Sequence, residues 1–403
     1  MAKVVFFNLP YYGHMNPTLP LVAELVRRGE QVRYYSSETF RPAIEQAGAT
    51  FRGIDAVMTE HTSVDENLMR YALTLIRATQ EIIPLILPEV QAEPPDYLLH
   101  DALCPWGKCV AQILKIPAIA SVATLARPHS VLHPEVLASF FILLPTVMQM
   151  ALTSQRERAQ FGAICKHLQK TYQIPRPTIG SVYNNLADFN IVYSTRQMQI
   201  YPCAFDERFK FVGPFLGGEV AAPPFPFEEL GEEPLIYIAL GTVFNDNVTF
   251  YRLCLEAFAD RPYRVVLVIG SKVDLPDLGT IPSNFIIKPF VPQFQLLQRA
   301  ALFITHGGMN SVSGGLWAGV PLLMLPQAAD QPLIAKRVQR LGAGKWLRPR
   351  HLTAHQLRAA AEEILAQPTY RQRSAAIGVS FRQAGGPTAA VDAIEAFKRK
   401  YGL

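Results

Sequence analysis

The chain has 403 residues, 49% of them hydrophobic and 18% charged, which excludes a disordered polymer and predicts two or three domains. Its net charge of +5 is small and, apart from the short run at 398–400, its basic residues are scattered, so we do not expect nucleic-acid binding. Five cysteines without a C-x-x-C pair predict buried, reduced thiols in a cytoplasm. The first residues lead directly into a strand without a signal-peptide pattern, so we do not expect secretion.

The first half of the chain alternates apolar strands with helices. The expected elements are a strand at 4–8, a loop at 9–15, a helix at 16–26, a strand at 31–36, a helix ending at Gly48, a strand from 50, a helical region at 55–93, a strand at 97–100, a helix at 106–114, and strands at 116–122, 190–194 and 211–213. Near-continuous apolar strands in such an alternation predict an α/β fold with a parallel, doubly wound sheet.

Residues 125–180 are rich in Leu, Phe and Met, and we expect them to form a wall or lid over a binding cleft. The uncharged segment 136–152 within them falls short of the roughly 20 residues that a transmembrane helix needs. We therefore predict a buried helix pair lining an apolar pocket, with an interfacial helix as the alternative, and no transmembrane segment.

A change of composition between Phe215 and Pro234 marks a domain boundary, because it brings paired glycines, paired prolines and an acidic run. After it the alternation restarts, with strands at 235–239, 264–269 and 285–288 and helices at 249–259 and 294–300. We expect four parts: a first domain at 1–215, a linker at 216–234, a second domain at 235–385, and a C-terminal helix at 386–403 that packs on the first domain.

The stretch LFITHGGMNSVSGGLWAGVPLLMLPQAADQ carries the clearest site pattern. It predicts a strand at 302–305, a turn at 306–308, a helix that begins near the capping residues Asn310 and Ser311, and a second strand at 320–325. In parallel α/β units, ligands lie beyond the carboxyl ends of the strands, where a helix N-terminus offers N–H groups and a positive dipole end.

A pyrophosphate fits such a site. The glycines let the backbone approach the anion, His306, Asn310 and Ser311 can donate to its oxygens, and Asp330-Gln331 can bind hydroxyl groups nearby.

Six separated motifs together resemble one family, the bacterial macrolide-type branch of the UDP-glycosyltransferases, which have the GT-B fold. The motifs are Tyr12-Gly13-His14-Met15-Asn16-Pro17, Leu240-Gly241-Thr242, Val291-Pro292-Gln293, His306-Gly307-Gly308-Met309-Asn310-Ser311, Gly319-Val320-Pro321 and Asp330-Gln331. The resemblance spans the chain. It implies two Rossmann-like domains facing across a cleft, the first binding the acceptor and the second the nucleotide sugar.

By this resemblance, Gln293 contacts the ribose or base, Thr242 and Ser311 the phosphates, and His306 the diphosphate. Asp330 and Gln331 would bind the sugar hydroxyls. The remaining residues implied in the donor site are Phe290, Val291, Gly308 and Asn310.

The chemistry requires a base for the acceptor hydroxyl, and His14, in the expected loop after the first strand, suits that role near neutral pH. Asp101, at the carboxyl end of another strand, is the natural partner for its imidazole, whereas His100 should point to the other side of the sheet. The expected helix N-terminus at Asn310 and Ser311 would hold the leaving diphosphate without a metal ion, and the chain has no D-x-D pair. A single displacement would invert the anomeric carbon, so an α-linked UDP sugar would give a β-glycoside.

The acceptor is expected to be an apolar, aromatic or polycyclic small molecule that carries a hydroxyl. Candidate cleft walls are Tyr11, Tyr12, Trp106 and Phe140, although an aromatic residue taken singly is more often a core side chain than a ligand contact.

Two positions depart from the family pattern. Gly314 stands where the family has a glutamate that binds the ribose hydroxyls, and the loss of such a charged hydrogen bond is worth about 1.5–3 kcal/mol unless Ser313 or a water replaces it. Phe290 stands where plant relatives have a tryptophan that stacks on uracil. We hypothesise that ribose and deoxyribose donors are poorly discriminated, so that dTDP-sugars are accepted alongside UDP-sugars.

Three other functions stay open at this point: transfer of another sugar, such as a deoxysugar, to a natural product; a nucleotide-sugar-binding protein without catalysis, for which Gly314 is the one hint; and a 2-epimerase of the same fold. The oligomeric state is not indicated by the sequence.

Overall fold

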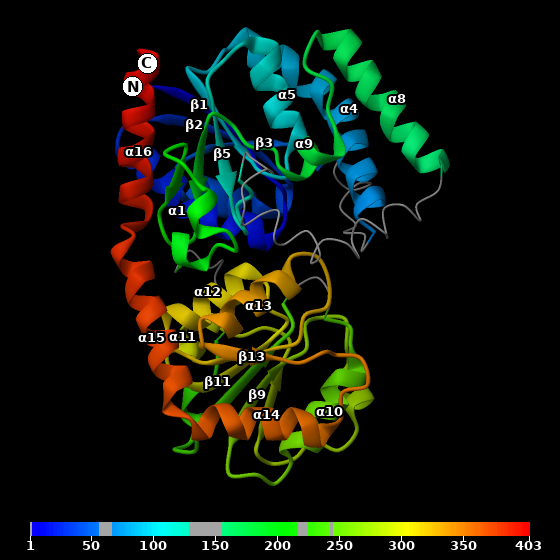
Figure 1. Cartoon of the computed structure of the whole chain (residues 1–403), viewed down its shortest axis with the longest axis vertical. Helices are drawn as coiled ribbons and strands as arrows, with labels where there is room; N and C mark the ends of the chain where they lie inside the picture. Colours follow the sequence, from blue (N-terminus) through cyan, green and yellow to red (C-terminus); the bar gives the residue numbers. More distant parts are fainter. Residues whose placement is uncertain (1, 56–66, 129–154, 217–223, 242–244) are drawn as a thin grey trace. The chain divides into compact units, whose positions relative to one another are not determined.

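The computed structural model describes residues 2–55, 67–128, 155–216, 224–241 and 245–403 of the chain. These form two compact units, of which unit 1 comprises Met1–Gly218 with Gly385–Leu403 and unit 2 comprises Glu219–Ala384 (Figure 1). Thr242, Phe140 and the uncharged segment 136–152 lie outside the described residues.

Unit 1 is built on a seven-stranded sheet in the order β3-β2-β1-β4-β5-β6-β7, and every pair of neighbouring strands is parallel. The strands are β1 Lys3–Phe7, β2 Gln31–Ser36, β3 Thr50–Gly53, β4 Tyr97–Asp101, β5 Ala118–Val122, β6 Phe189–Val192 and β7 Phe209–Phe211. The predicted doubly wound parallel sheet is therefore confirmed. The strand order of this sheet reverses direction between β1 and β4. In sheets of this kind, ligands bind beside such a point, beyond the carboxyl ends of the strands.

Helices cover both faces of this sheet because alternate strand residues point to opposite sides. The described helices of unit 1 are α1 Tyr12–Arg27, α2 Arg41–Gln46, α4 Leu68–Ala92, α5 Pro105–Leu114, α8 Gln155–Tyr172, α9 Ile179–Tyr183 and α16 Gly386–Tyr401. Phe6 and Leu99 pack in one core cluster with residues of α1 and α16, whereas Phe7 and Leu98 pack in another with residues of α4 and α5.

The helix α16 belongs to unit 1, where it lies along α1 (Figure 1). Its buried residues Val391 and Ile394 are part of the same core cluster as α1. Arg28, which follows α1 as its C-cap residue, forms ion pairs with Asp392 at 2.7 Å and Glu395 at 2.9 Å. The predicted return of the last helix to the first domain is confirmed.

Unit 2 repeats the plan with six parallel strands in the order β10-β9-β8-β11-β12-β13. The strands are β8 Leu235–Ala239, β9 Arg264–Val268, β10 Phe285–Lys288, β11 Ala300–Thr305, β12 Leu322–Met324 and β13 Gly344–Trp346. The described helices are α10 Val248–Phe258, α11 Gln293–Leu297, α12 Met309–Trp317, α13 Gln331–Arg340, α14 Ala354–Ala366 and α15 Pro368–Gln383.

The strand β13 was not predicted, because GKW has neither the β-branched residues nor the length of a typical strand signal. Its pairing depends on Gly344, since a Cβ there would lie 2.1 Å from the carbonyl oxygen of Leu322. The close approach of the backbones, and not side-chain propensity, forms this edge of the sheet.

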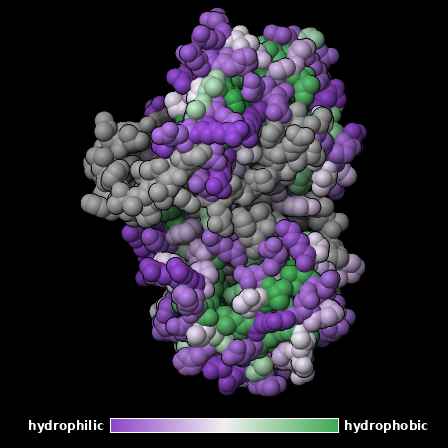
Figure 2. All heavy atoms as spheres, turned by 90° about the vertical axis from the view of Figure 1, so that its right-hand side faces the viewer, coloured by the Kyte–Doolittle hydropathy of each residue, from purple (hydrophilic) through white to green (hydrophobic). Residues whose placement is uncertain are grey.

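On the face shown in Figure 2, hydrophilic side chains cover much of the described surface, and hydrophobic ones appear in smaller areas between them. Scattered apolar residues of this kind are normal on protein surfaces. Among the described residues, no helix combines the length and the apolar character needed to span a membrane.

Candidate functional site

The structure brings His14 and Asp101 together in unit 1. His14 Nδ1 lies 2.7 Å from Asp101 Oδ2, and the two side chains are 17% and 0% exposed. A carboxylate at this distance favours the tautomer in which Nδ1 carries the proton, and the Nε2 nitrogen then holds the lone pair. The pair therefore has the arrangement of an imidazole base with an orienting carboxylate.

The Asp101 carboxylate is fixed on both of its oxygens. It ends β4, and its Oδ1 accepts the backbone N–H of Leu103 at 2.6 Å while Oδ2 faces His14. His100 points to the opposite face of the sheet, as predicted, and lies beside Asn185, with 3.3 Å between His100 Nδ1 and Asn185 Nδ2. Burial lowers the pKa of His100 from 6.5 to about 4, so this second histidine is neutral at physiological pH.

His14 does not lie in a loop, as the sequence suggested, but in the first turn of α1. The helix begins at Tyr12, four residues before the expected cap Asn16. Sequence rules favour a start at Asn16-Pro17, because proline is common at the first helical position, but here Pro17 lies inside the helix, where it has no N–H to donate to the carbonyl of Gly13. A helical turn fixes the backbone of His14 more firmly than a loop would.

The two tyrosines before His14 have different surroundings. Tyr11 lies near the base, with 6.2 Å between the ring centroids, and burial raises its pKa to about 12. Tyr12 is 42% exposed and packs edge-on against Phe40 at 5.0 Å. Of the two, Tyr11 is placed beside the His14 imidazole.

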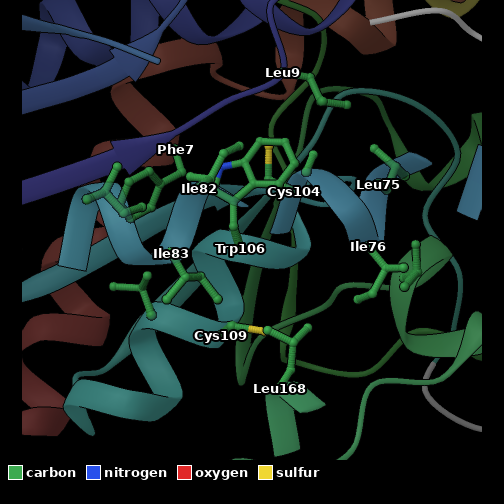
Figure 3. Packing of buried hydrophobic residues seen from close by; sticks show 14 of the residues in the cluster. Phe7, Leu9, Leu75, Ile76, Ile82, Ile83, Cys104, Trp106, Cys109 and Leu168 are labelled. Carbon is green, nitrogen blue, oxygen red and sulfur yellow. The ribbon is translucent and has the colours of Figure 1, made fainter. Parts of the chain in front are cut away.

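Trp106 is a core residue and not an exposed wall. Its side chain is 0% exposed, and Figure 3 shows the indole lying among Phe7, Ile82 and Cys104. The expectation of an acceptor contact is corrected here, because the direction in which α5 faces the sheet turns this side chain inward.

In unit 2, His306 follows β11, and its ring occupies the space that side chains would need at two nearby glycine positions. A Cβ at Gly308 would lie 2.4 Å from His306 Nε2, and one at Gly241 would lie 2.6 Å from His306 Cε1. Gly241 and Gly308 therefore leave room for the imidazole of His306. Burial lowers the pKa of His306 from 6.5 to about 4, so at neutral pH it offers a hydrogen bond and no positive charge.

The helix α12 begins at Met309, with Gly308 as its N-cap and no side-chain cap. Asn310 and Ser311 therefore lie inside the first turn and do not cap it, which corrects the prediction. The N-terminal N–H groups of this nine-residue helix have no intrahelical acceptors and point out beside His306. An anion can be bound there.

Gln293, the first residue of α11, lies next to Gly314. A Cβ at Gly314 would be 3.8 Å from Gln293 Nε2 and 3.1 Å from Leu297 Cδ1. The buried Tyr237 hydroxyl donates to Gln293 Oε1 at 3.2 Å, which turns the amide nitrogen toward Gly314. Tyr237 was missed by the sequence reading, and its one signal is a single hydroxyl within the apolar strand LIYIA.

The neighbours of Gln293 and Gly314 differ in exposure. Phe290 is 50% exposed, whereas Val291 is partly buried. Ser313 is 1% exposed, and its buried hydroxyl has no hydrogen-bond partner among the residues that the structure describes. The suggestion that Ser313 replaces the missing glutamate is corrected, because its oxygen is enclosed by protein.

Asp330 and Gln331 begin α13 and do not form an open loop. Gln331 Oε1 accepts the N–H groups of Gln327 at 2.8 Å and Ala328 at 3.2 Å, so its carbonyl oxygen is used to hold the turn before the helix. Asp330 is partly exposed. The amide nitrogen of Gln331 and the carboxylate of Asp330 thus stand at the start of this helix.

The predicted donor residues of unit 2 that the structure describes thus gather at the carboxyl ends of its strands. Among the described residues, no group of three or more His, Cys, Asp and Glu side chains is placed to hold a metal ion. All five cysteines are free thiols, and only Cys203 is exposed.

Comparisons with known proteins agree with this arrangement. Residues 252–397 match the family described as erythromycin biosynthesis protein CIII-like, C-terminal domain. The chain is 35% identical to the NDP-glycosyltransferase YjiC of Bacillus licheniformis over 99% of this chain and 98% of that protein. It is 30% identical to the demethyllactenocin mycarosyltransferase of Streptomyces fradiae, over 98% and 86% of the two chains.

Among solved structures, the glycotransferase of kitacinnamycin superposes with a TM-score of 0.84 at 28% identity, covering 98% of both chains. Matches of this extent include both units, in the same order along the chain. The chain therefore belongs to the bacterial macrolide-type UDP-glycosyltransferases of the GT-B fold, a family of sugar-transferring enzymes of the natural-product type.

Proposed function

We propose that the protein is an inverting glycosyltransferase that moves glucose from UDP-glucose to a hydroxyl group of an apolar, aromatic or polycyclic small molecule. The observation that carries the proposal is the pair formed by His14 and Asp101, with 2.7 Å between Nδ1 and Oδ2. It supports a general base in unit 1 that is oriented and, once protonated, stabilised by a buried carboxylate.

In the proposed step the acceptor oxygen attacks the anomeric carbon and its proton passes to His14 Nε2. The bond from the anomeric carbon to the diphosphate oxygen breaks, and UDP leaves with the electron pair. Because the nucleophile enters opposite the leaving group, an α-linked donor gives a β-glycoside.

The leaving group would be held in unit 2. The N-terminal N–H groups of α12 can donate hydrogen bonds to the diphosphate, with His306 beside them, and the helix dipole favours its charge. In this proposal these groups hold the diphosphate without a metal ion. Asp330 and the Gln331 amide nitrogen would bind the sugar hydroxyls, the first as acceptor and the second as donor.

The acceptor would bind to unit 1 near Tyr11, which lies beside His14. Oxidising surroundings are not expected for a protein with five free thiols, so we propose a cytoplasmic location.

A transfer assay tests the proposed function directly. Incubation of the protein with UDP-glucose and a polyphenol is expected to give a product that is heavier by one hexosyl group, and proton NMR of its anomeric coupling should identify a β-glycoside. An α-glycoside would contradict the inverting mechanism. Conversion of the nucleotide sugar without any acceptor would instead indicate an epimerase, and nucleotide-sugar binding with no turnover across an acceptor panel would indicate a binding protein.

The donor preference is the second expectation, and Gly314 supports it. With no side chain at Gly314, the ribose hydroxyls would lack a carboxylate partner here and would bond to the amide nitrogen of Gln293. UDP and 2′-deoxy-UDP should therefore bind within about tenfold of each other, a smaller difference than the roughly 1.5–3 kcal/mol of a charged hydrogen bond. Titration calorimetry with these two nucleotides isolates the 2′-hydroxyl, and turnover of UDP-glucose against dTDP-glucose extends the comparison to the sugar donor.

Gly314→Glu is expected to increase the preference for UDP over 2′-deoxy-UDP, and Gly314→Ala is the matched control for the added Cβ. Leu297 Cδ1, the end of a flexible side chain, is the nearest atom to that Cβ, so both variants should fold. A large preference for UDP in the unchanged protein would refute the relaxed-donor hypothesis and leave the transfer function standing.

A further inference from the structure

A buried polar network lies directly beneath the first turn of α1. Asn8, just after β1, Thr18 in α1 and Tyr34 in β2 are all 0% exposed. Asn8 Nδ2 lies 2.6 Å from the Tyr34 hydroxyl and 3.1 Å from Thr18 Oγ1, and the two hydroxyls are 2.6 Å apart. Three uncharged polar groups thus meet within an otherwise apolar core.

The protons of this network can be assigned from the donors that each group has. The Thr18 hydroxyl donates its one proton to the Met15 carbonyl oxygen at 2.8 Å, so in the contact between the two hydroxyls it must accept from Tyr34. The Tyr34 oxygen then accepts from Asn8 Nδ2. Burial raises the pKa of Tyr34 well above its usual value, so this hydroxyl keeps its proton.

The network also reaches the backbone of the proposed base. Asn8 Nδ2 donates to the carbonyl oxygen of His14 at 3.1 Å, and Asn8 Oδ1 accepts the N–H of Leu9 at 3.0 Å. Asn8 therefore links the end of β1 to the residue that carries the imidazole. Together with the bond from Thr18, it fixes two successive carbonyl groups, those of residues 14 and 15.

The first turn of α1 needs this support for a local reason. Its N-cap, Tyr11, makes no side-chain cap bond, and Pro17 within the helix has no N–H to donate to the carbonyl of Gly13. The buried side chains below this turn add hydrogen bonds to the carbonyl groups of residues 14 and 15.

We propose that Asn8, Thr18 and Tyr34 are positioning residues. They hold the turn that carries His14, so that its imidazole keeps the hydrogen bond to Asp101. The inference rests on the proposed function, because it assigns the network to the base of that reaction. None of the three residues contacts the substrate in this proposal. Their effect is on turnover, since displacement of a catalytic group by about 1 Å can cost 10²-fold in rate.

The test compares Thr18→Val with Thr18→Ser. Valine has nearly the shape of threonine but neither donates to the Met15 carbonyl nor accepts from Tyr34, whereas serine keeps the hydroxyl. Thr18→Val is expected to lower kcat by about 10- to 100-fold with an unchanged KM for the nucleotide sugar, and Thr18→Ser to restore most of the loss. UDP binding and the thermal unfolding midpoint are measured on the same samples, and kcat is expressed per folded molecule.

Tyr34→Phe is the second variant, because it removes only the hydroxyl and keeps the ring contact with Phe6, whose centroid lies 4.7 Å away. It decides the question if Thr18→Val does not fold. A kcat equal to that of the unchanged protein in folded Thr18→Val or Tyr34→Phe, with only the unfolding midpoint lowered, would overturn the inference and leave the network a purely structural one. Loss of turnover without rescue by Thr18→Ser would also overturn it.

The same assay includes His14→Ala, so that the role of His14 as base and the positioning role of the network are tested separately. If His14→Ala retains full turnover, the proposed base is wrong whatever the Thr18 variants do. If His14→Ala is inactive and Thr18→Val is fully active, the base stands and the positioning role is rejected.

Discussion

Replacement of His14 by alanine is expected to lower kcat by about 10²- to 10⁴-fold, the usual contribution of a general base. Alanine leaves the acceptor hydroxyl with no group to take its proton, while the donor residues of unit 2 are untouched. UDP binding measured by calorimetry should therefore be unchanged. The product is followed by mass spectrometry at saturating donor and acceptor concentrations.

His167→Ala is a matched control, because His167 is an exposed histidine on α8 of the same unit. Its variant should transfer sugar at the unchanged rate. Full activity of His14→Ala would show that His14 is not the base of the reaction.

Asp101→Asn is expected to be nearly as damaging, with a loss of up to about 10⁴-fold in kcat, as in other imidazole and carboxylate pairs. The backbone N–H of Leu103 requires an acceptor at 2.6 Å, so the oxygen of the new amide will face Leu103 and its NH₂ group will face His14 Nδ1. Nδ1 must then be the unprotonated nitrogen, which places the proton on Nε2. In that tautomer Nε2 cannot accept the acceptor's proton.

Because the amide has the size of the carboxylate and satisfies Leu103, the fold should survive, and the circular dichroism spectrum and UDP affinity should match those of the unchanged protein. Asp274→Asn, at an exposed position in unit 2, controls for the change of charge. A rate within a few-fold of the unchanged protein would mean that the carboxylate does not set the tautomer of the base, since that role is worth orders of magnitude in rate.

Much of the fold could be predicted from the sequence, because apolar strands and intervening helices follow short-range rules. The parallel sheets were predicted, and with them the carboxyl ends at which His14 and Asp101 meet. Whether the two residues act as base and partner stays a prediction. The same rules failed for β13, where a close backbone approach at Gly344 replaces any propensity signal.

Features that depend on three-dimensional direction could not be predicted. The inward turn of Trp106 follows from how α5 lies on the sheet, and the position of Ser311 inside the first turn of α12 follows from backbone angles at Gly308. The network of Asn8, Thr18 and Tyr34 joins two strands and a helix, and no local pattern connects those three positions. The network, unlike the start of α12, arises where residues distant in sequence meet.

The return of α16 to unit 1 bears on the order in which the protein is completed during synthesis. Residues 1–218 leave the ribosome first, yet their core cluster includes Val391 and Ile394. Unit 2 is continuous, from Glu219 to Ala384, so all of its residues have been made before α16 is available. The unit that carries His14 and Asp101 is thus the first to begin and the last to be finished, and until then the apolar face that α16 covers has no native partner.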